Sequence, residues 1–289
     1  MREYNDLNDF FANIHFEQIA IKYLVSNQDY QRNVSEFHVR RAVENFDPYQ
    51  VNPVKVSRRD GINYVFNGQH TIEIIAEVTG SRDTLVWCMI YDDLEYRHEA
   101  DIFANQQKYV RQLSAFDIFN AKIESGDEEA MIIKSIVENY NLYIAHNKYP
   151  RSICAISSLV YIYEKYGCKI LDSTIRLCVA TWQGESNSLS SYILKAVATL
   201  LDVYKDELNE ELFKDKLGLV PISQISRSAK AMIQGTRGYG YAITILNFYN
   251  HRLSKPLEVS KLYTKKQPSD KNFTLRLLTD NSSVSSKEG

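Results

Sequence analysis

A glycine turn between a short apolar strand and a helix-like segment carries the side chains best suited to binding chemistry. Residues 64–66 read as the strand, and residues 67–71 (Asn-Gly-Gln-His-Thr) form the turn. Such a turn directs backbone N–H groups and a helix N-terminus at one point, which favours an anion such as phosphate. Gly68 permits a tight turn or a close approach to a ligand. Gln69 and His70 can then donate hydrogen bonds to that ligand.

Three residues in or near this turn each have alternative interpretations. His70 can donate to a phosphate or act as an acid or base, but it can equally hold the turn at the start of the helix. Thr71 can cap the helix and donate one hydrogen bond. Arg32 can bind phosphate or pair with a carboxylate such as Glu44 or Glu73.

Two further segments have features of nucleic-acid contact. Residues 152–166 and 172–183 have the outline of a helix-turn-helix, but Arg176 is the only basic residue of the second helix. Two packed core helices therefore explain this pair better than base recognition. Residues 234–240 are glycine-rich without the Gly-Lys-Ser/Thr end of a P-loop, which favours a helix–helix connection. Basic residues in this region that can contact a DNA backbone are Arg176, Arg227, Lys230 and Arg237.

The composition indicates a globular protein without a general affinity for nucleic acid. The chain has 289 residues, of which 44% are hydrophobic, so one large or two modest domains can form. A formal net charge of -2 excludes a global basic field, so any DNA contact must come from a local patch. The polar N-terminus lacks an apolar signal core, and no apolar run is long enough for a membrane span. We therefore expect a cytoplasmic protein without membrane contact.

The cysteines and histidines predict no metal site. The four cysteines include no CxxC pair, and no histidine lies at zinc-finger spacing from them. Each cysteine lies in an apolar segment or beside a turn, so we expect buried thiols in a reducing compartment. The six histidines are scattered, and neither a Ser/His/Asp set nor paired carboxylates stand out. The cysteines are Cys88, Cys154, Cys168 and Cys178.

The first part of the chain alternates short strands with helices. Ser35 is a plausible N-cap, and the Asp-Pro pair at 47–48 ends the helix that Ser35 begins. Arg58 and Arg59 precede an Asp-Gly pair typical of a hairpin, so we expect both arginines in a solvated turn. The predicted strands are 16–23 (one strand or a short strand pair), 53–57, 64–66 and 84–91, and the predicted helices are 35–45, 72–79 and 95–107.

The rest of the chain has helical patterns only. Ser114 is the expected cap of a helix over 114–124, with Asp117 at the capping-box position, and Asp127 caps the next helix, which runs to 140. Further helices are predicted at 152–166, 172–183, 188–204, 208–217, 222–233 and 240–253. The predicted fold class is thus α+β. Its expected parts are a mixed α/β domain over 1–125, a helical domain over 126–262 and a disordered tail over 263–289.

The turn and the segments around it resemble the N-terminal domain of the ParB/sulfiredoxin-like superfamily. The resemblance covers residues 1–125. It joins Tyr-Gln-Arg at 30–32, Asn-Pro-Val-Lys-Val at 52–56, the turn at 67–71 and Ala-Asn-Gln-Gln-Lys at 104–108. The turn looks most like the Asp-Gly-Gln-His-Arg turn of the phage and mobile-element branch. What this resemblance implies is a nucleotide cradle for CTP or ATP with Mg²⁺, contact with DNA and, as in many ParB-like relatives, a homodimer.

On this resemblance, one set of residues would bind the phosphates of a nucleotide. The set combines the Tyr-Gln-Arg box, the turn and the segment after residue 104. Its members are Arg32, Gly68, Gln69, His70, Thr71, Asn105, Lys108 and Arg111.

The chain departs from the family pattern at several of these positions. Gln69 stands where sulfiredoxin has a cysteine, which excludes chemistry through that thiol. Thr71 stands where the family has an arginine, and its hydroxyl lacks the charge and the paired donors of a guanidinium. Lys108 or Arg111 can supply positive charge instead. Ala104 stands where CTP-hydrolysing relatives have an acid, so Mg²⁺ has one fewer oxygen ligand. We therefore expect weak or no turnover.

Three functions are compatible with these features. The first is a ParB-like protein of a phage or mobile element that binds a nucleotide, DNA or both, in DNA maintenance, regulation or defence-related interplay. The second is an NTP-dependent enzyme (an NTPase, phosphotransferase or nuclease) that uses the same cradle. The third is an interaction module whose tyrosine-rich helical domain binds a host protein.

Overall fold

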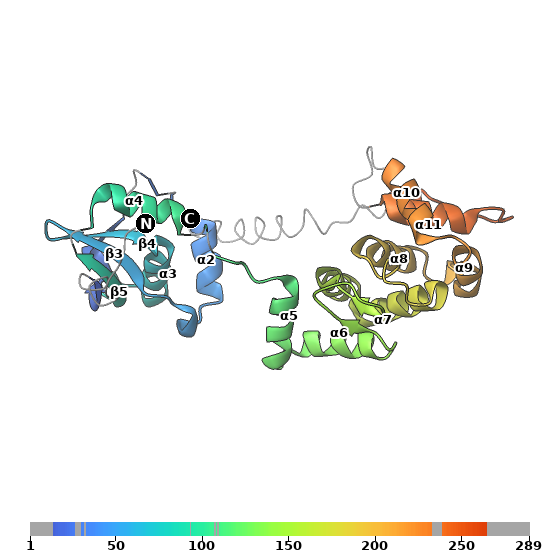
Figure 1. Cartoon of the computed structure of the whole chain (residues 1–289), viewed down its shortest axis with the longest axis horizontal. Coiled ribbons are helices and arrows are strands. Elements are labelled where there is room, and N and C mark those ends of the chain that lie inside the picture. The colour runs from blue at the N-terminus through green and yellow to red at the C-terminus, as the bar shows by residue number, and fades with distance from the viewer. Residues whose placement is uncertain are drawn as a thin grey trace, which may run out of the picture. The chain divides into compact units, whose positions relative to one another are not determined.

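The structure is a computed structural model that describes residues 14–26, 30–31, 33–92, 94–106, 108, 110–232 and 239–264. The chain divides into two compact units, residues 1–112 and 113–289, which are drawn in Figure 1. Unit 1 contains a five-stranded sheet with helices, and unit 2 is built almost entirely of helices. This confirms the predicted α+β class. The domain limits at 125 and 262 stay predictions about independent folding.

The sheet of unit 1 is mixed, with the strand order β1-β5-β3-β4-β2. β1 pairs with β5 and β3 with β4 antiparallel, whereas β5 pairs with β3 and β4 with β2 in parallel. Alternating side chains of the strands, among them Val54, Val56 and Cys88, form the core of the unit together with Ile72 of helix α3. The strands are β1 (Ile14–Ala20), β2 (Leu24–Ser26), β3 (Val54–Arg59), β4 (Ile62–Asn67) and β5 (Leu85–Asp92).

In the described part of unit 1, three α-helices accompany this sheet: α2 (Glu36–Glu44), α3 (Gln69–Thr79) and α4 (Tyr96–Asn105). The predicted cap of α2 is confirmed, because the Ser35 side chain accepts a hydrogen bond from the backbone of His38. Helix α3 starts directly after Gly68, three residues earlier than predicted. Thr71 therefore lies in the first turn of α3, and the prediction that it caps the helix is wrong.

The β3–β4 hairpin corrects the expectation for Arg58 and Arg59. Both residues belong to β3, where Arg58 lies opposite Asn63 and Arg59 opposite Ile62. Only Asp60 and Gly61 form the turn, with φ angles of 51° and 76°. A two-residue hairpin turn with both φ angles positive matches the twist of its strands, so pairing continues through both arginines.

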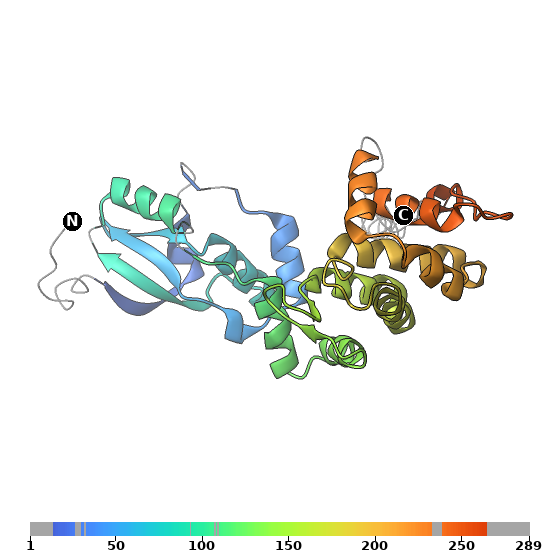
Figure 2. The same ribbon diagram turned by 45° about the vertical axis from the view of Figure 1, so that its right-hand side comes forward.

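Unit 2 is shown from a second direction in Figure 2. Ser114 and Asp117 form the predicted capping box at the start of α5. The prediction of helices alone missed a two-residue parallel ladder, β6 (Tyr143–Ile144) with β7 (Ser152–Ile153). The helices are α5 (Ala115–Glu124), α6 (Glu128–Glu138), α7 (Ile156–Trp182), α8 (Ser191–Tyr204), α9 (Glu210–Leu217), α10 (Ile222–Ala231), α11 (Gly240–Asn250) and α12 (Lys261–Thr264).

Helix α7 contains a sharp kink at Gly167, whose φ of 82° and ψ of 172° are not helical. The two parts of α7 are the pair of helices with a helix-turn-helix outline in the sequence. Thr174, Cys178 and Trp182 of the second part are buried in the core of the unit. Since a recognition helix must expose such positions, the packed-core interpretation of this pair agrees with the structure.

The expectation of four buried thiols holds for only two of the cysteines. Cys88 and Cys178 are buried, and burial raises the pKa of the Cys88 thiol to about 11. Cys154 and Cys168 are exposed, because Cys154 lies between β7 and α7 and Cys168 follows the kink in α7. Over the described ranges, none of the helices has both the length and the apolar character needed to cross a bilayer.

Candidate functional site

The glycine turn that the sequence singled out joins β4 directly to α3. Gly68 has a φ of 106°, and a Cβ atom built on it would lie 3.2 Å from Cγ1 of Val54. Both the positive φ and the close approach of β3 require glycine here. Because the N-cap residue has no side chain, no side chain from that position caps the first turn of α3. The arrangement therefore has the geometry of an anion site at a helix N-terminus.

His70 connects the start of α3 to the start of α2. Its Nε2 atom accepts a hydrogen bond of 3.2 Å from the backbone N–H of Ser35, the N-cap of α2. The rings of His70 and His38 meet edge to face, with 5.2 Å between their centroids. A neutral histidine that accepts at Nε2 carries its proton on Nδ1. His70 thus brings two helix N-termini together, which is the turn-holding role considered from the sequence.

The end of α4 also reaches the turn. The Asn67 side-chain amide donates a hydrogen bond of 2.6 Å to Oε1 of Gln106, which lies in the segment 104–108 but was not among the predicted site residues. Asn105 donates to the backbone and the carboxylate of Asp101, one turn earlier in its own helix. Lys108 and Arg111 follow α4 and are exposed. The structure therefore brings the end of α4 to the turn, whereas the Asn105 amide itself bonds within α4.

A buried charge cluster lies on the same unit and was not predicted. Glu99 of α4 has no exposed surface, and its Oε2 lies 3.0 Å from Nη2 of Arg59. The hydroxyl of Tyr30 donates to Oε1 of Glu99, and the guanidinium of Arg59 lies 4.4 Å from the centre of the Tyr64 ring. Burial, followed by the hydrogen bond to Glu99, raises the pKa of Tyr30. The cluster joins α4 and Tyr30 to β3 of the sheet.

Two predicted arginines, Arg32 and Arg237, lie outside the described residues. The neighbour of Arg32, Gln31, is buried and donates from its side chain to the backbone oxygen of Val65 in β4. This bond places residue 31 beside the strand that leads into the turn. Side chains alternate along a strand, so residues 57 and 59 of β3 lie on the same face of the sheet. This alternation could have predicted that Arg59 contacts another element of the fold.

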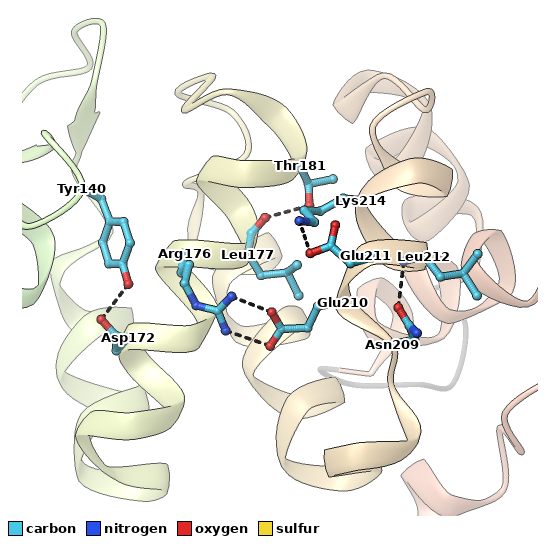
Figure 3. A network of polar contacts seen from close by, with 10 residues as sticks. All are labelled: Tyr140, Asp172, Arg176, Leu177, Thr181, Asn209, Glu210, Glu211, Leu212 and Lys214. Atoms are coloured by element: carbon cyan, nitrogen blue, oxygen red, sulfur yellow. Dashed lines mark hydrogen bonds and ion pairs between the residues drawn. The ribbon is translucent and has the colours of Figure 1, made fainter.

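Of the predicted DNA-contacting residues that the structure describes, Arg176 is paired within the protein, whereas Arg227 and Lys230 are exposed. Arg176 of α7 donates two hydrogen bonds, of 2.6 and 2.8 Å, to the carboxylate of Glu210 in α9. Figure 3 shows this bidentate ion pair beside the Tyr140–Asp172 hydrogen bond. The guanidinium of Arg176 is therefore engaged within the protein. Arg227 and Lys230 are exposed and lie three residues apart, so both project from one face of α10.

The described residues of unit 1 include a groove but no group placed to hold a metal ion. Among the described residues, no group of three or more His, Cys, Asp or Glu side chains is placed to hold a metal ion. Unit 1 has a groove of about 310 Å³ between the segment 46–54, Ile75 of α3 and the start of β5. Its lining is mostly apolar and consists of Phe46, Pro48, Val51, Asn52, Pro53, Val54, Ile75, Leu85, Val86 and Trp87.

The chain is similar to a protein family and to a solved structure. The model of a family described as "Family of unknown function (DUF6551)" matches residues 25–258. No curated protein matches the chain. A solved structure that is similar is the C-terminally truncated chromosome-partitioning protein ParB from Caulobacter crescentus, complexed with CTP-gamma-S. It is 13% identical, the match covers 80% of this chain and 92% of that chain, and the TM-score of 0.32 is too low to equate the folds.

Proposed function

Because the chain belongs to the Family of unknown function (DUF6551), we propose a function from the site itself: the turn at residues 67–71 binds the phosphates of a nucleotide. In this proposal the protein is a ParB-like nucleotide- and/or DNA-binding protein of a phage or mobile element. It acts in the cytoplasm in DNA maintenance, regulation or defence-related interplay. The nucleotide is CTP or ATP, with the Mg²⁺ that accompanies it.

The observation that carries the proposal is the junction of β4 and α3. Gly68 has a backbone conformation and a contact with Val54 that exclude a side chain, so no side chain of the N-cap residue covers the first turn of α3. His70 brings the N-terminus of α2 beside the N-terminus of α3. Each helix N-terminus favours a negative charge near it, which supports a phosphate over a neutral group.

The proposed protein turns over nucleotide weakly or not at all. Ala104 supplies no carboxylate at the end of α4, and the carboxylate of Glu99 is held by Arg59 and Tyr30. Thr71, in the first turn of α3, offers a hydroxyl but no positive charge. Binding thus relies on backbone N–H groups and on Lys108 or Arg111, and Mg²⁺ would have few protein oxygen ligands.

A thermal-shift panel on the full chain tests the proposal, with CTP, ATP, GTP and UTP in the presence and absence of Mg²⁺. A ligand that binds only the folded protein raises the melting temperature by mass action. The informative variant is Thr71→Asp, because a carboxylate in the first turn suits the helix dipole but repels phosphate. Gln18→Glu on β1 is the matched control, since it adds the same charge at an exposed strand position.

The expected result is a shift with one nucleotide that Thr71→Asp abolishes and Gln18→Glu preserves. A flat panel at millimolar nucleotide, or a shift that both variants keep, overturns phosphate binding at this turn. Released phosphate is measured in the same samples. Metal-dependent hydrolysis that disappears in His70→Ala would support the enzyme interpretation and contradict weak turnover.

A further inference from the structure

A surface of tyrosines and lysines on α7 and α8 of unit 2 has no role in the site described above. We define this Tyr–Lys surface as Tyr161 and Lys165 of α7 with Tyr192 and Lys195 of α8. Tyr161 and Lys165 lie four residues apart, and Tyr192 and Lys195 three apart, so each pair shares one helix face. Tyr161 is 38% exposed and Tyr192 is 66% exposed.

Two ammonium groups converge on the ring of Tyr161. Nζ of Lys195 lies 4.8 Å from the ring centroid, and Nζ of Lys165 lies 5.2 Å from it. Lys165 also donates a hydrogen bond of 2.8 Å to the Tyr161 hydroxyl. Within the described part of the chain, neither ammonium has a carboxylate within 4.0 Å. The surface is therefore locally positive although the whole chain has a net charge of -2.

In the described part of the chain, Tyr192 stacks on one other aromatic ring. It stacks on Tyr241 of α11 with 5.0 Å between the ring centroids and 11° between the planes. Tyr241 is only 8% exposed, so Tyr192 covers it and keeps its own outer face open to solvent. A ring held flat in this way loses little freedom when another planar group stacks on it.

We propose that this Tyr–Lys surface binds single-stranded nucleic acid, with a base stacked on Tyr192 and backbone phosphates at Lys165 and Lys195. A single strand offers both the open base face and the phosphates, whereas a duplex hides its base faces in the stack. The inference deepens the nucleic-acid half of the proposed function and rests on it. It does not depend on nucleotide binding at the turn of unit 1.

Fluorescence anisotropy with the full chain tests the inference, using a labelled oligothymidylate of about 20 nucleotides, longer than most single-strand sites. Tyr192→Leu removes the ring and should weaken binding about tenfold or more, whereas Tyr192→Phe keeps the ring and should retain the affinity. Lys165→Gln with Lys195→Gln should lower the salt slope by about 1.4, which is about 0.7 per phosphate contact. Lys134→Gln with Lys214→Gln is the control, because these lysines pair with Glu138 and Glu211.

Three results would overturn the inference: no binding of the strand at saturating protein, equal affinity of Tyr192→Leu and Tyr192→Phe, or a salt slope that the control pair lowers equally. A duplex of the same sequence is measured in parallel. If the duplex binds and the strand does not, the inference fails and the proposed function stands. If the strand binds through Tyr192 while the nucleotide panel is flat, the inference stands and nucleotide binding fails. If the Tyr–Lys surface instead binds a peptide or a protein, the labelled oligothymidylate does not bind and the inference fails.

Discussion

The Nη2 atom of Arg59 lies 3.0 Å from Oε2 of Glu99, a carboxylate with no exposed surface. The pair joins the β3 strand to helix α4, and Tyr30 adds a hydrogen bond to the same carboxylate. A buried charge that loses its partner is costly, because the remaining charge is left desolvated. The stability of unit 1 should therefore depend on both partners together.

We expect Glu99→Gln to lower the free energy of unfolding by about 2–4 kcal/mol, since Arg59 then faces a neutral amide. In a double-mutant cycle with Arg59→Met, the coupling energy should reach at least about 1 kcal/mol. Urea denaturation measures all three variants. The exposed Arg82–Glu73 pair, with N–O distances of 2.8 and 3.0 Å, is the control and should couple by about 0.5 kcal/mol. Equal coupling in the two pairs would contradict the role of burial.

Gly68 should tolerate alanine less well than Gly61. Both residues have positive φ angles, of 106° and 76°, so alanine costs about 1–2 kcal/mol at either position. At Gly68 the new Cβ atom also meets Val54 at 3.2–3.3 Å, whereas nothing lies within 4 Å at Gly61. We expect Gly68→Ala to be more destabilising than Gly61→Ala by about 1 kcal/mol or more. Chemical denaturation of both variants measures the loss in unfolding free energy. Equal losses would mean that β3 shifts to accommodate the new Cβ atom at little cost.

Arg176 should make little contribution to DNA binding. Its guanidinium is held by both oxygens of Glu210, so Arg176→Gln should leave the affinity for duplex DNA unchanged. Because the pair is partly exposed, the loss of stability should be about 0.5–1 kcal/mol. If α10 contacts DNA, Arg227→Gln with Lys230→Gln should instead lower the salt slope by about 1.8, or about 0.9 for each phosphate. Titrations at several salt concentrations compare the two; a steeper loss from Arg176→Gln would restore it as a DNA contact.

Alkaline pH should destabilise the protein through Cys88. Burial raises the pKa of this thiol from 9.0 to about 11. Between these values the unfolded chain releases the proton and the folded chain keeps it, so stability falls as the pH rises. One such group contributes a slope of about -1.4 kcal/mol per pH unit. Tyr140 and Tyr204, whose pKa values burial raises to about 12, add to the slope as tyrosines of the unfolded chain titrate near pH 10, so the denaturation of each variant is compared with that of the wild type between pH 9 and 10. Cys88→Ala should reduce the slope by the share of one thiol, while the buried Cys178, whose pKa is also raised, keeps its own share; Cys168→Ala, at an exposed position, should leave the slope unchanged.

Some features of this protein follow from short stretches of sequence alone. The Ser114–Asp117 capping box, the cap at Ser35, the Asp-Gly hairpin and the glycine turn before α3 were all predicted and are present. These features depend on hydrogen bonds and backbone angles within about four residues, which a local pattern encodes. The alternation of strands and helices likewise determined the α+β class.

Other features were decided only by the tertiary structure. Val54 is what makes Gly68 indispensable, His70 bonds Ser35 across 35 residues, and Tyr30 reaches Glu99 across 69. Such contacts depend on strand order and on where each helix packs, and a local pattern specifies neither. The same reason explains why Arg59 was expected in solvent and why Arg176 was expected to be available. The sequence determined where the turn lies, and the packing of β3, α2 and α4 determined what surrounds it.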